Sequence, residues 1–282
     1  MPRVWAFTGS WTGTLLHVEH IEDEDPGLVT PYWHVQSIFV SELAVSAARG
    51  FAPGVGASLT VPVRLVRDHI RFEDLSRAPY EPPSPDTHHR NETLLHLADP
   101  TAALVLARPF GPWVASATTG VSVPLGRTEP NPFELGRQGL PHQHIQFGTG
   151  TWNPVASVSL GRPWGRTTLT LAGTGKWVLY ENTHGYRAGD RYTAMLDVGR
   201  RLSPAWGADA GLTLAHEKPE TWDGRLEEEG NLGRSDLFLG LGVTRGIPGR
   251  GAFSLRVQFP LKSESEGNQV SYPFVLSLGY TR

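Results

Sequence analysis

The chain of 282 residues contains no cysteine, so neither a disulfide framework nor a thiolate metal site can form. Charged residues make up 19% of it, below the usual quarter. The net charge is −3 and there is no basic tract, which argues against nucleic acid as a partner. No apolar run approaches the roughly 18 residues that a membrane-spanning helix needs.

Turn-forming residues are abundant instead. The chain has 32 glycines and 23 prolines, above the roughly 12% that both together reach in average proteins. Such a composition is typical of many strands joined by turns, and it disfavours long helices.

The C-terminal end shows a regular alternation of apolar with small or polar residues. In the last segment one face holds Tyr272, Phe274, Leu276, Leu278 and Tyr280. Successive side chains of a strand point to opposite sides of the sheet, so this segment has one apolar and one polar face. Aromatic residues near the ends of the apolar face suit a sheet with lipid outside and water inside. The pattern predicts a transmembrane β-barrel.

The whole chain reads as about twelve antiparallel strands of a single barrel domain, 1–282. An even number of strands is normal for bacterial outer-membrane barrels. The expected strands are 3–16, 32–48, 56–67, 99–108, 112–125, 152–161, 166–180, 190–202, 206–217, 234–245, 250–262 and 270–281.

The expected connections alternate between long and short. The short ones, which all contain Gly or Pro, are 49–56, 108–113, 161–166, 202–207 and 245–251. The long ones are 17–31, 68–98, 126–151, 181–189, 218–233 and 263–269. Outer-membrane barrels have short periplasmic turns and long outer loops, so both termini should lie on the short-turn side. A soluble sandwich has no reason to sort its connections in this way.

Aromatic residues cluster near the short connections, at Phe110, Trp113, Trp164 and Trp206. A ring of such side chains is typical of the membrane–water boundary. The alternative is that large aromatics only keep strands together near their turns.

Two short motifs resemble the outer-membrane barrel family named for phenol meta-pathway degradation. One is Phe147–Pro154, with its Gly-Thr-Gly segment, and the other is Ser41–Gly50 leading into Leu59–Pro62. The chain departs from that pattern at Asn153, where Asp is expected, and it continues past Tyr280 instead of ending on an aromatic. The resemblance implies a channel or transporter-like protein of the Gram-negative outer membrane for a small, aromatic solute.

An outer-membrane protein needs a signal peptide at synthesis, but Met1–Phe7 already reads as strand, without a basic n-region and an apolar h-region. We therefore expect that the numbering follows a mature or truncated form.

Most histidines are expected at one mouth of the barrel, in the long connections. Imidazole and carboxylate groups can together bind zinc or copper. The candidate metal ligands are His17, His20, His88, His89, His142 and His144. Of these, His142 and His144 would point the same way on extended backbone, whereas His17 and His20 would converge only in a turn. The simpler alternative is that exposed loops tolerate histidine. A third hypothesis is a proton-sensitive gate at the mouth of the barrel.

The polar face of the strands supplies charges of both signs for a pore lining. The candidates are Lys176, Arg191, Asp197, Arg201, Asp209, Glu217, Arg256 and Lys262. A barrel of about twelve strands has a narrow lumen, and paired Arg and Asp side chains could close much of it. These charges could equally pack against one another without any solute passing.

An enzyme is not expected, because no Gly-x-Ser-x-Gly elbow occurs and no Ser stands beside a His with an orienting partner. The prediction is a channel whose partners are membrane lipid and a small solute, with no nucleic acid. The alternatives are metal binding at the histidine-rich mouth and a soluble β-barrel or sandwich binding protein. The oligomeric state stays open.

Overall fold

The computed structural model describes residues 5–22, 30–82, 91–265 and 270–282, and it is almost entirely β-structure. The wall strands are β1 (Trp5–Glu22), β2 (Tyr32–Ala52), β3 (Val55–Glu73), β4 (Glu92–Leu97), β5 (Thr101–Phe110), β6 (Trp113–Ser122), β7 (Asn153–Trp164), β8 (Thr167–Lys176), β10 (Arg191–Arg201), β11 (Trp206–Glu217), β13 (Arg234–Ile247), β14 (Gly251–Ser265), β15 (Val270–Ser271) and β16 (Val275–Thr281). The connections contain α1 (Pro132–Arg137), β9 (Tyr186–Arg187) and β12 (Thr221–Trp222). Among the described residues, no helix has the length and apolar character needed to cross a membrane.

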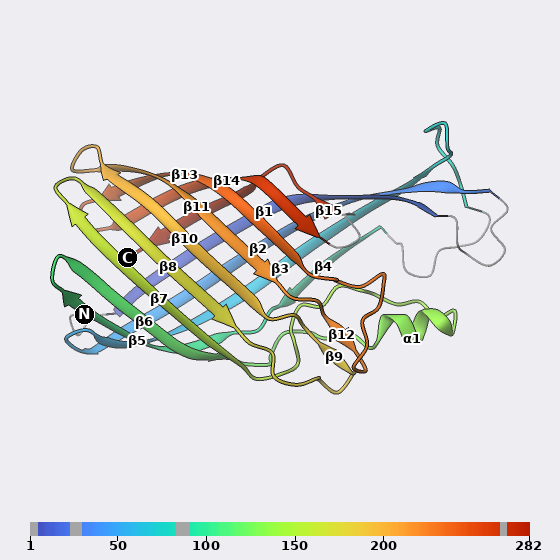
Figure 1. Ribbon diagram of the computed structural model, residues 1–282, viewed down its shortest axis with the longest axis horizontal. Helices are drawn as coiled ribbons and strands as arrows, with labels where there is room; N and C mark the ends of the chain where they lie inside the picture. Colours follow the sequence, from blue (N-terminus) through green and yellow to red (C-terminus); the bar gives the residue numbers. More distant parts are fainter. Residues whose placement is uncertain (1–4, 23–29, 83–90, 266–269) are drawn as a thin grey trace.

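The wall is a closed antiparallel barrel of twelve strands, as predicted (Figure 1). Closure occurs at β1, where Gly13 pairs with Ser41 of β2 on one side and with Leu276 of β16 on the other. The short strands β4 and β15 occupy no additional positions around the wall. They continue β5 and β16 toward the long connections, along β3 and β1 respectively.

Several strands run further than the alternation pattern predicted. The strand 206–217 has the expected bounds, but β1 continues to Glu22 and β3 continues to Glu73. The expected loops 17–31 and 68–98 are therefore wrong in part, since both contain strand. Main-chain pairing does not require apolar side chains, so polar residues such as His17 and Asp68 extend the ladder beyond the apolar part of the wall.

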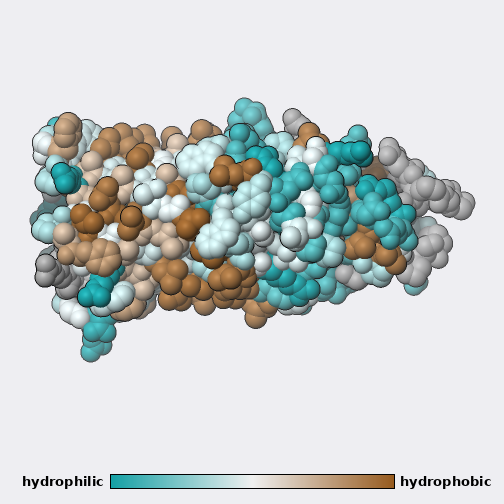
Figure 2. Space-filling model, turned by 90° about the horizontal axis from the view of Figure 1, so that it is seen from below, coloured by the Kyte–Doolittle hydropathy of each residue, from teal (hydrophilic) through white to brown (hydrophobic). Residues whose placement is uncertain are grey.

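The outer surface of the barrel is apolar along the part nearer the short turns (Figure 2). Leucines on successive strands are exposed there, among them Leu43, Leu104, Leu160, Leu171, Leu196, Leu212, Leu241, Leu255 and Leu278. Monomeric soluble proteins rarely expose so continuous an apolar surface. The residues between these leucines along each strand face the barrel interior, which we call the lumen.

The two ends of the barrel are built differently. Both termini and the short turns lie at one end, as predicted, and the long connections lie at the other (Figure 1). We call these the short-turn end and the long-loop end. The tightest turns place Gly111 and Gly165 at φ of 58° and 61°, a conformation that glycine adopts without steric cost.

Part of the long-loop end has a small core of its own, which we call the cap. Val178, Tyr186, Ala188 and Trp222 are buried together, and Phe133 of α1 packs against them. The two-stranded sheet of β9 and β12 holds Tyr186 opposite Trp222. The helix α1, which the sequence pattern did not predict, is capped by the Asn131 side chain.

Candidate functional site

Three of the predicted pore-lining charges form one row across adjacent strands near the long-loop end. Arg191 of β10 lies directly opposite Lys176 of β8 and opposite Glu217 of β11. Arg191 donates to Glu217 at 2.9 Å. The Arg191 side chain faces inward yet keeps 53% of its surface exposed, so the lumen at this level is open to water.

A second group of predicted lining charges lies further toward the short-turn end. Arg256 of β14 forms ion pairs with Asp197 of β10, at 2.9 Å, and with Asp209 of β11. The arginine reaches these partners by crossing the intervening strands over glycine. A Cβ at Gly240 would clash with Arg256, and one at Gly242 would clash with Asp209. The sequence thus leaves room along the wall for this ionic cluster.

The two remaining candidates are placed differently. Arg201 lies on the same face of β10 as Asp197 but at the short-turn end, where it is exposed. Lys262 does not face the lumen. A bulge in the pairing of β13 with β14 changes the alternation, so that Ser263, and not Lys262, donates inward to Asp236. Lys262 is exposed and pairs with Glu264.

The pattern analysis missed further charged groups that face the lumen. Arg64 of β3 donates twice to Glu42 of β2, at 2.8 and 3.2 Å. Both residues alternate with outward apolar residues on predicted strands, so the rule used for the other lining residues would have found them. Asp99 also faces the lumen side, and it was expected at the start of the strand 99–108, whereas β5 begins only at Thr101.

Asp99 sits in the interruption between β4 and β5 and holds the following connection in place. Its carboxylate accepts hydrogen bonds from the backbone N–H of Gly126 at 2.9 Å and of Thr149 at 2.8 Å, and from the Thr149 hydroxyl at 2.7 Å. Gly126 and Gly148 pack so closely here that a Cβ on either would clash. The connection between β6 and β7 is therefore attached to the wall at both of its ends.

The Gly-Thr-Gly motif turns out to be the second half of this attachment. Thr149, Thr151 and Asn153 are buried in succession as the chain enters β7. The Asn153 amide donates to the Thr149 oxygen at 2.6 Å, while its carbonyl accepts from Thr151 at 2.9 Å. An Asp at this position could not donate to Thr149, and it would add a second carboxylate near Asp99. The departure from the family motif at Asn153 thus has a local structural reason.

The inward-folded connection and the lumen wall enclose a cavity of about 250 Å³. Its wall side includes Glu42, Arg64, Lys176 and Arg191, and its loop side includes residues 146–149. Tyr186 and Ala188 of the cap contribute as well. The cavity therefore lies between the barrel and the folded loops, and it is the main candidate site of the molecule.

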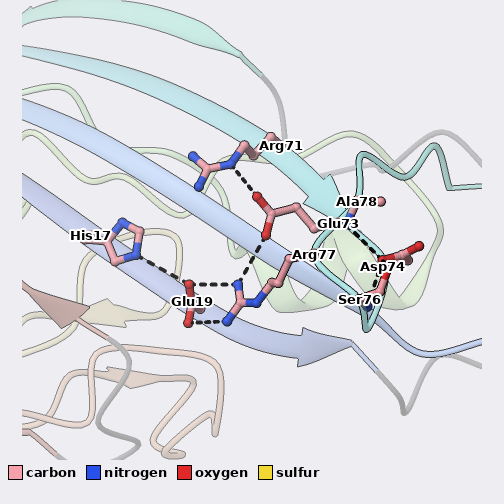
Figure 3. Close-up of polar contacts among 8 residues, drawn as sticks. All are labelled: His17, Glu19, Arg71, Glu73, Asp74, Ser76, Arg77 and Ala78. Atoms are coloured by element: carbon pink, nitrogen blue, oxygen red, sulfur yellow. Dashed lines mark hydrogen bonds and ion pairs between the residues drawn. The ribbon is translucent and has the colours of Figure 1, made fainter.

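The predicted pair His17 and His20 does not come together. Both residues lie in β1, where a separation of three places them on opposite faces. His17 is 3.6 Å from Glu19, which Arg77 links to Glu73 on the projecting β1–β3 extension (Figure 3). His20 instead contacts the buried His34 of β2, with 3.4 Å between ring nitrogens.

The rings of His142 and His144 do lie side by side, with 5.1 Å between their centroids. His142 is 2.8 Å from the Leu140 carbonyl oxygen through Nδ1. His88 and His89 lie outside the described residues. Within the described part of the chain, no three His, Asp or Glu side chains are arranged to hold a metal ion. The zinc or copper hypothesis therefore gains no support.

The cap is linked to the wall by a buried carboxylate. Asp190 accepts from the Val178 backbone N–H at 2.8 Å and from Lys218 at 3.0 Å. Burial alone would raise the pKa of Asp190, but these donors hold its pKa below the ordinary value. Glu220 differs, because burial is the dominant influence there and raises the pKa of its carboxyl. Its contacts include the Trp222 indole N–H at 3.1 Å.

The short-turn end carries the predicted aromatic residues together with arginines. Arg162 lies over Trp113, Arg245 over Trp206 and Arg49 over Trp5, each with the guanidinium carbon 5.3 to 5.5 Å from the ring centroid. Phe110 and Trp164 project outward, with 73% and 84% of their surface exposed. Amphipathic side chains of this kind suit a membrane–water boundary.

No family model matches the chain, and no curated protein matches it. Among solved structures, it is similar to the COG4313 outer membrane channel from Pseudomonas putida F1, with a TM-score of 0.67 and 12% identity over 100% of this chain and 96% of that one. It is also similar to a TodX deltaS2S3 mutant monoaromatic hydrocarbon channel, with a TM-score of 0.51 and 8% identity over 100% of this chain and 91% of that one. At these identities the likeness concerns the fold. The chain thus has the fold of outer-membrane channel barrels.

Proposed function

We propose that this protein is a channel of the bacterial outer membrane through which a small solute passes. The observation that carries the proposal is the contrast between the two faces of the closed wall. The outer face is lined with exposed leucines, whereas the lumen holds hydroxyl groups and charges, with Arg191 half exposed to water inside it. Hydroxyl pairs such as Ser46–Thr60 and Ser116–Ser159 bridge neighbouring strands on the lumen side. This arrangement is that of a transmembrane barrel with a polar interior.

The orientation follows from the lengths of the connections. Short turns face the periplasm in such barrels, so the cap and the cavity would lie at the extracellular side. An aromatic solute is supported by the short motifs and by the similarity in fold to a monoaromatic hydrocarbon channel. The soluble alternative is disfavoured by the apolar outer face.

The test is single-channel conductance of the refolded protein in a planar bilayer, with insertion checked separately. Discrete steps are expected, with a small amplitude because the lumen is narrow and the cap covers its outer mouth. Verified insertion without any current would mean an occluded lumen and would contradict the proposal. A protein that stays soluble without detergent would contradict the membrane location itself.

A further inference from the structure

The cavity beneath the cap is lined by more basic than acidic side chains. Its basic groups are Arg64, Lys176 and Arg191, and the acidic groups among its lining are Glu42 and Asp99. Whether it can bind a charged solute depends on which of these groups are already engaged with one another.

The carboxylates are all engaged. Asp99 accepts two backbone N–H groups and one hydroxyl, and Glu42 accepts two bonds from Arg64. Glu217, just beyond the lining, accepts from Arg191 and from the Asn231 amide. No acidic group of the cavity is thus directed at Lys176.

The ammonium of Lys176 is the exception among the cations. It forms no hydrogen bond or ion pair with any residue in the described ranges. The other two lysines of the chain both have a carboxylate partner, since Lys218 pairs with Asp190 and Lys262 with Glu264. Lys176 is therefore the lysine whose charge is left without a direct counter-charge, and it lines the cavity.

The register of the strands makes this arrangement costly in the absence of a ligand. Lys176 and Arg191 are direct cross-strand partners that face the same side. Like charges directly opposite each other on antiparallel strands destabilise the sheet. An anion bound between the two groups would remove that repulsion and would supply the counter-charge that Lys176 lacks.

The chemistry of the cavity indicates the kind of anion. Guanidinium and ammonium groups bind carboxylates through charge-assisted hydrogen bonds. Phe147, Val178 and Ala188 also line the cavity, each with 5% or less of its surface exposed. The apolar part of the lining is therefore small, and it suits a compact apolar body. A volume of about 250 Å³ admits only a small molecule.

We propose that Lys176 and Arg191 form a binding site for the carboxylate of a small organic acid, whose apolar part lies against Phe147. This inference rests on the proposed function, because the site lies in the lumen of the proposed channel. It goes further by assigning a charged solute to the channel, in contrast to a hydrocarbon.

The experiment measures binding of benzoate to the refolded protein in detergent by calorimetry, with the neutral isostere benzamide and inorganic phosphate as comparisons. We expect benzoate to bind at least tenfold more tightly than either. Lys176→Gln should lower benzoate affinity by about tenfold, whereas Lys176→Arg, which keeps the charge, should retain most of it. The matched control is Lys262→Gln, which removes the same charge outside the lumen and should leave the affinity unchanged.

The outcomes separate this inference from the proposed function, because binding in detergent does not require conduction. Benzoate binding that depends on Lys176 in a protein that never conducts would support the site and contradict the channel. A conducting protein in which Lys176→Gln leaves benzoate affinity unchanged, or in which benzamide binds as tightly, would overturn the site. Phosphate binding as tight as benzoate binding would overturn the organic acid as its ligand. If Lys176→Gln does not refold, Arg191→Gln carries the same expectation.

Discussion

The connections at the two ends of this barrel differ in their residues and in how far they are buried. The five short connections contain six arginines and no acidic residue, at Arg49, Arg108, Arg162, Arg166, Arg245 and Arg250. Of the aromatic residues at this end, Trp5, Phe110, Trp164 and Trp206 are exposed. At the long-loop end, by contrast, Trp222 is almost fully buried and the connections fold onto one another.

The difference teaches where the stability of each end comes from. Aromatic and basic side chains at the short-turn end gain most of their energy from a surrounding membrane boundary, which the chain itself does not provide. The long-loop end gains its energy from contacts within the chain, above all from the hydrogen bonds of Asp99 and the packing around Trp222. Substitutions at the two ends should therefore respond differently to the removal of lipid.

The largest effect is expected from Asp99→Ala. The substitution removes three hydrogen bonds to a buried carboxylate, which corresponds to about 3–5 kcal/mol of local stability. The connection between β6 and β7 should leave the lumen, so conductance should rise several-fold and protease should cleave within 123–151. The barrel itself should persist, as judged by heat-modifiable mobility on a gel.

A matched control for Asp99 exists on the projecting tip of the β3 extension. Asp74 also accepts two backbone N–H groups and one hydroxyl, from Ser76 and Ala78, but it is only partly buried and follows β3 at the end of the projecting extension (Figure 3). Asp74→Ala should leave conductance and cleavage at 123–151 unchanged. An equal rise in conductance for both variants would show that the Asp99 attachment does not hold the connection in the lumen.

A direct comparison of the two ends uses one tryptophan from each. Trp222→Ala removes the largest buried side chain of the cap, so the cap should lose about 3–5 kcal/mol in detergent and in lipid alike. Trp164→Ala, at the short-turn end, should change stability in detergent by less than about 0.5 kcal/mol, and lower it further only in bilayers. Urea unfolding followed in both media measures this. Equal sensitivity of the two variants to lipid would remove the distinction between the ends.

A smaller effect is expected at the arginines of the short-turn end. Arg245→Gln removes the cation over the Trp206 ring and should lower stability in bilayers by about 0.5–1 kcal/mol. Arg250→Gln removes the same charge from the same turn, and no stacking of its guanidinium on an aromatic ring is present among the described residues. Urea unfolding in vesicles compares the two, and an equal loss would assign the effect to net charge instead of stacking.

The strands of the wall could be predicted from the sequence, but the folding of the long connections over the mouth of the barrel could not. The side chains of a strand point alternately to its two faces, whichever strands lie beside it. Leu212 and Asp209 could therefore be assigned to opposite faces of β11 from the pattern alone. The error at Lys262 has a related origin, because a one-residue bulge beside Pro260 reverses the alternation. A proline within a strand is a sign of such a bulge, and the alternation rule did not use it.

The contacts of the long-loop end depend on residues far apart in the chain. Asp99 and Thr149 are fifty residues apart, and in the structure neither lies within a strand or helix. The Gly-Thr-Gly segment was recognised as a motif, but its role in attaching a loop to Asp99 required the fold. The same holds for Lys176, whose lack of a partner emerges only when the partners of all other charges are known.

The smallest predicted effect concerns pH and the cap. Burial raises the pKa of Glu220 above its ordinary value of 4.5. A carboxyl whose pKa is higher in the folded state takes up a proton on folding, so below pH 4.5 the cap is at its full stability, and it weakens as pH rises through the raised pKa. Asp190, whose pKa is lowered, stays ionised above pH 4.5 and contributes a constant amount to the stability of the cap above that pH.

Protection of residues 181–189 from hydrogen exchange, corrected for the intrinsic rate, should therefore fall modestly from pH 4.5 to pH 8. Glu220→Gln should flatten this dependence, since its carbonyl can still accept from Trp222, whereas Glu229→Gln, at an exposed position of the same connection, should not. A dependence that survives in Glu220→Gln would place the titrating group elsewhere in the cap.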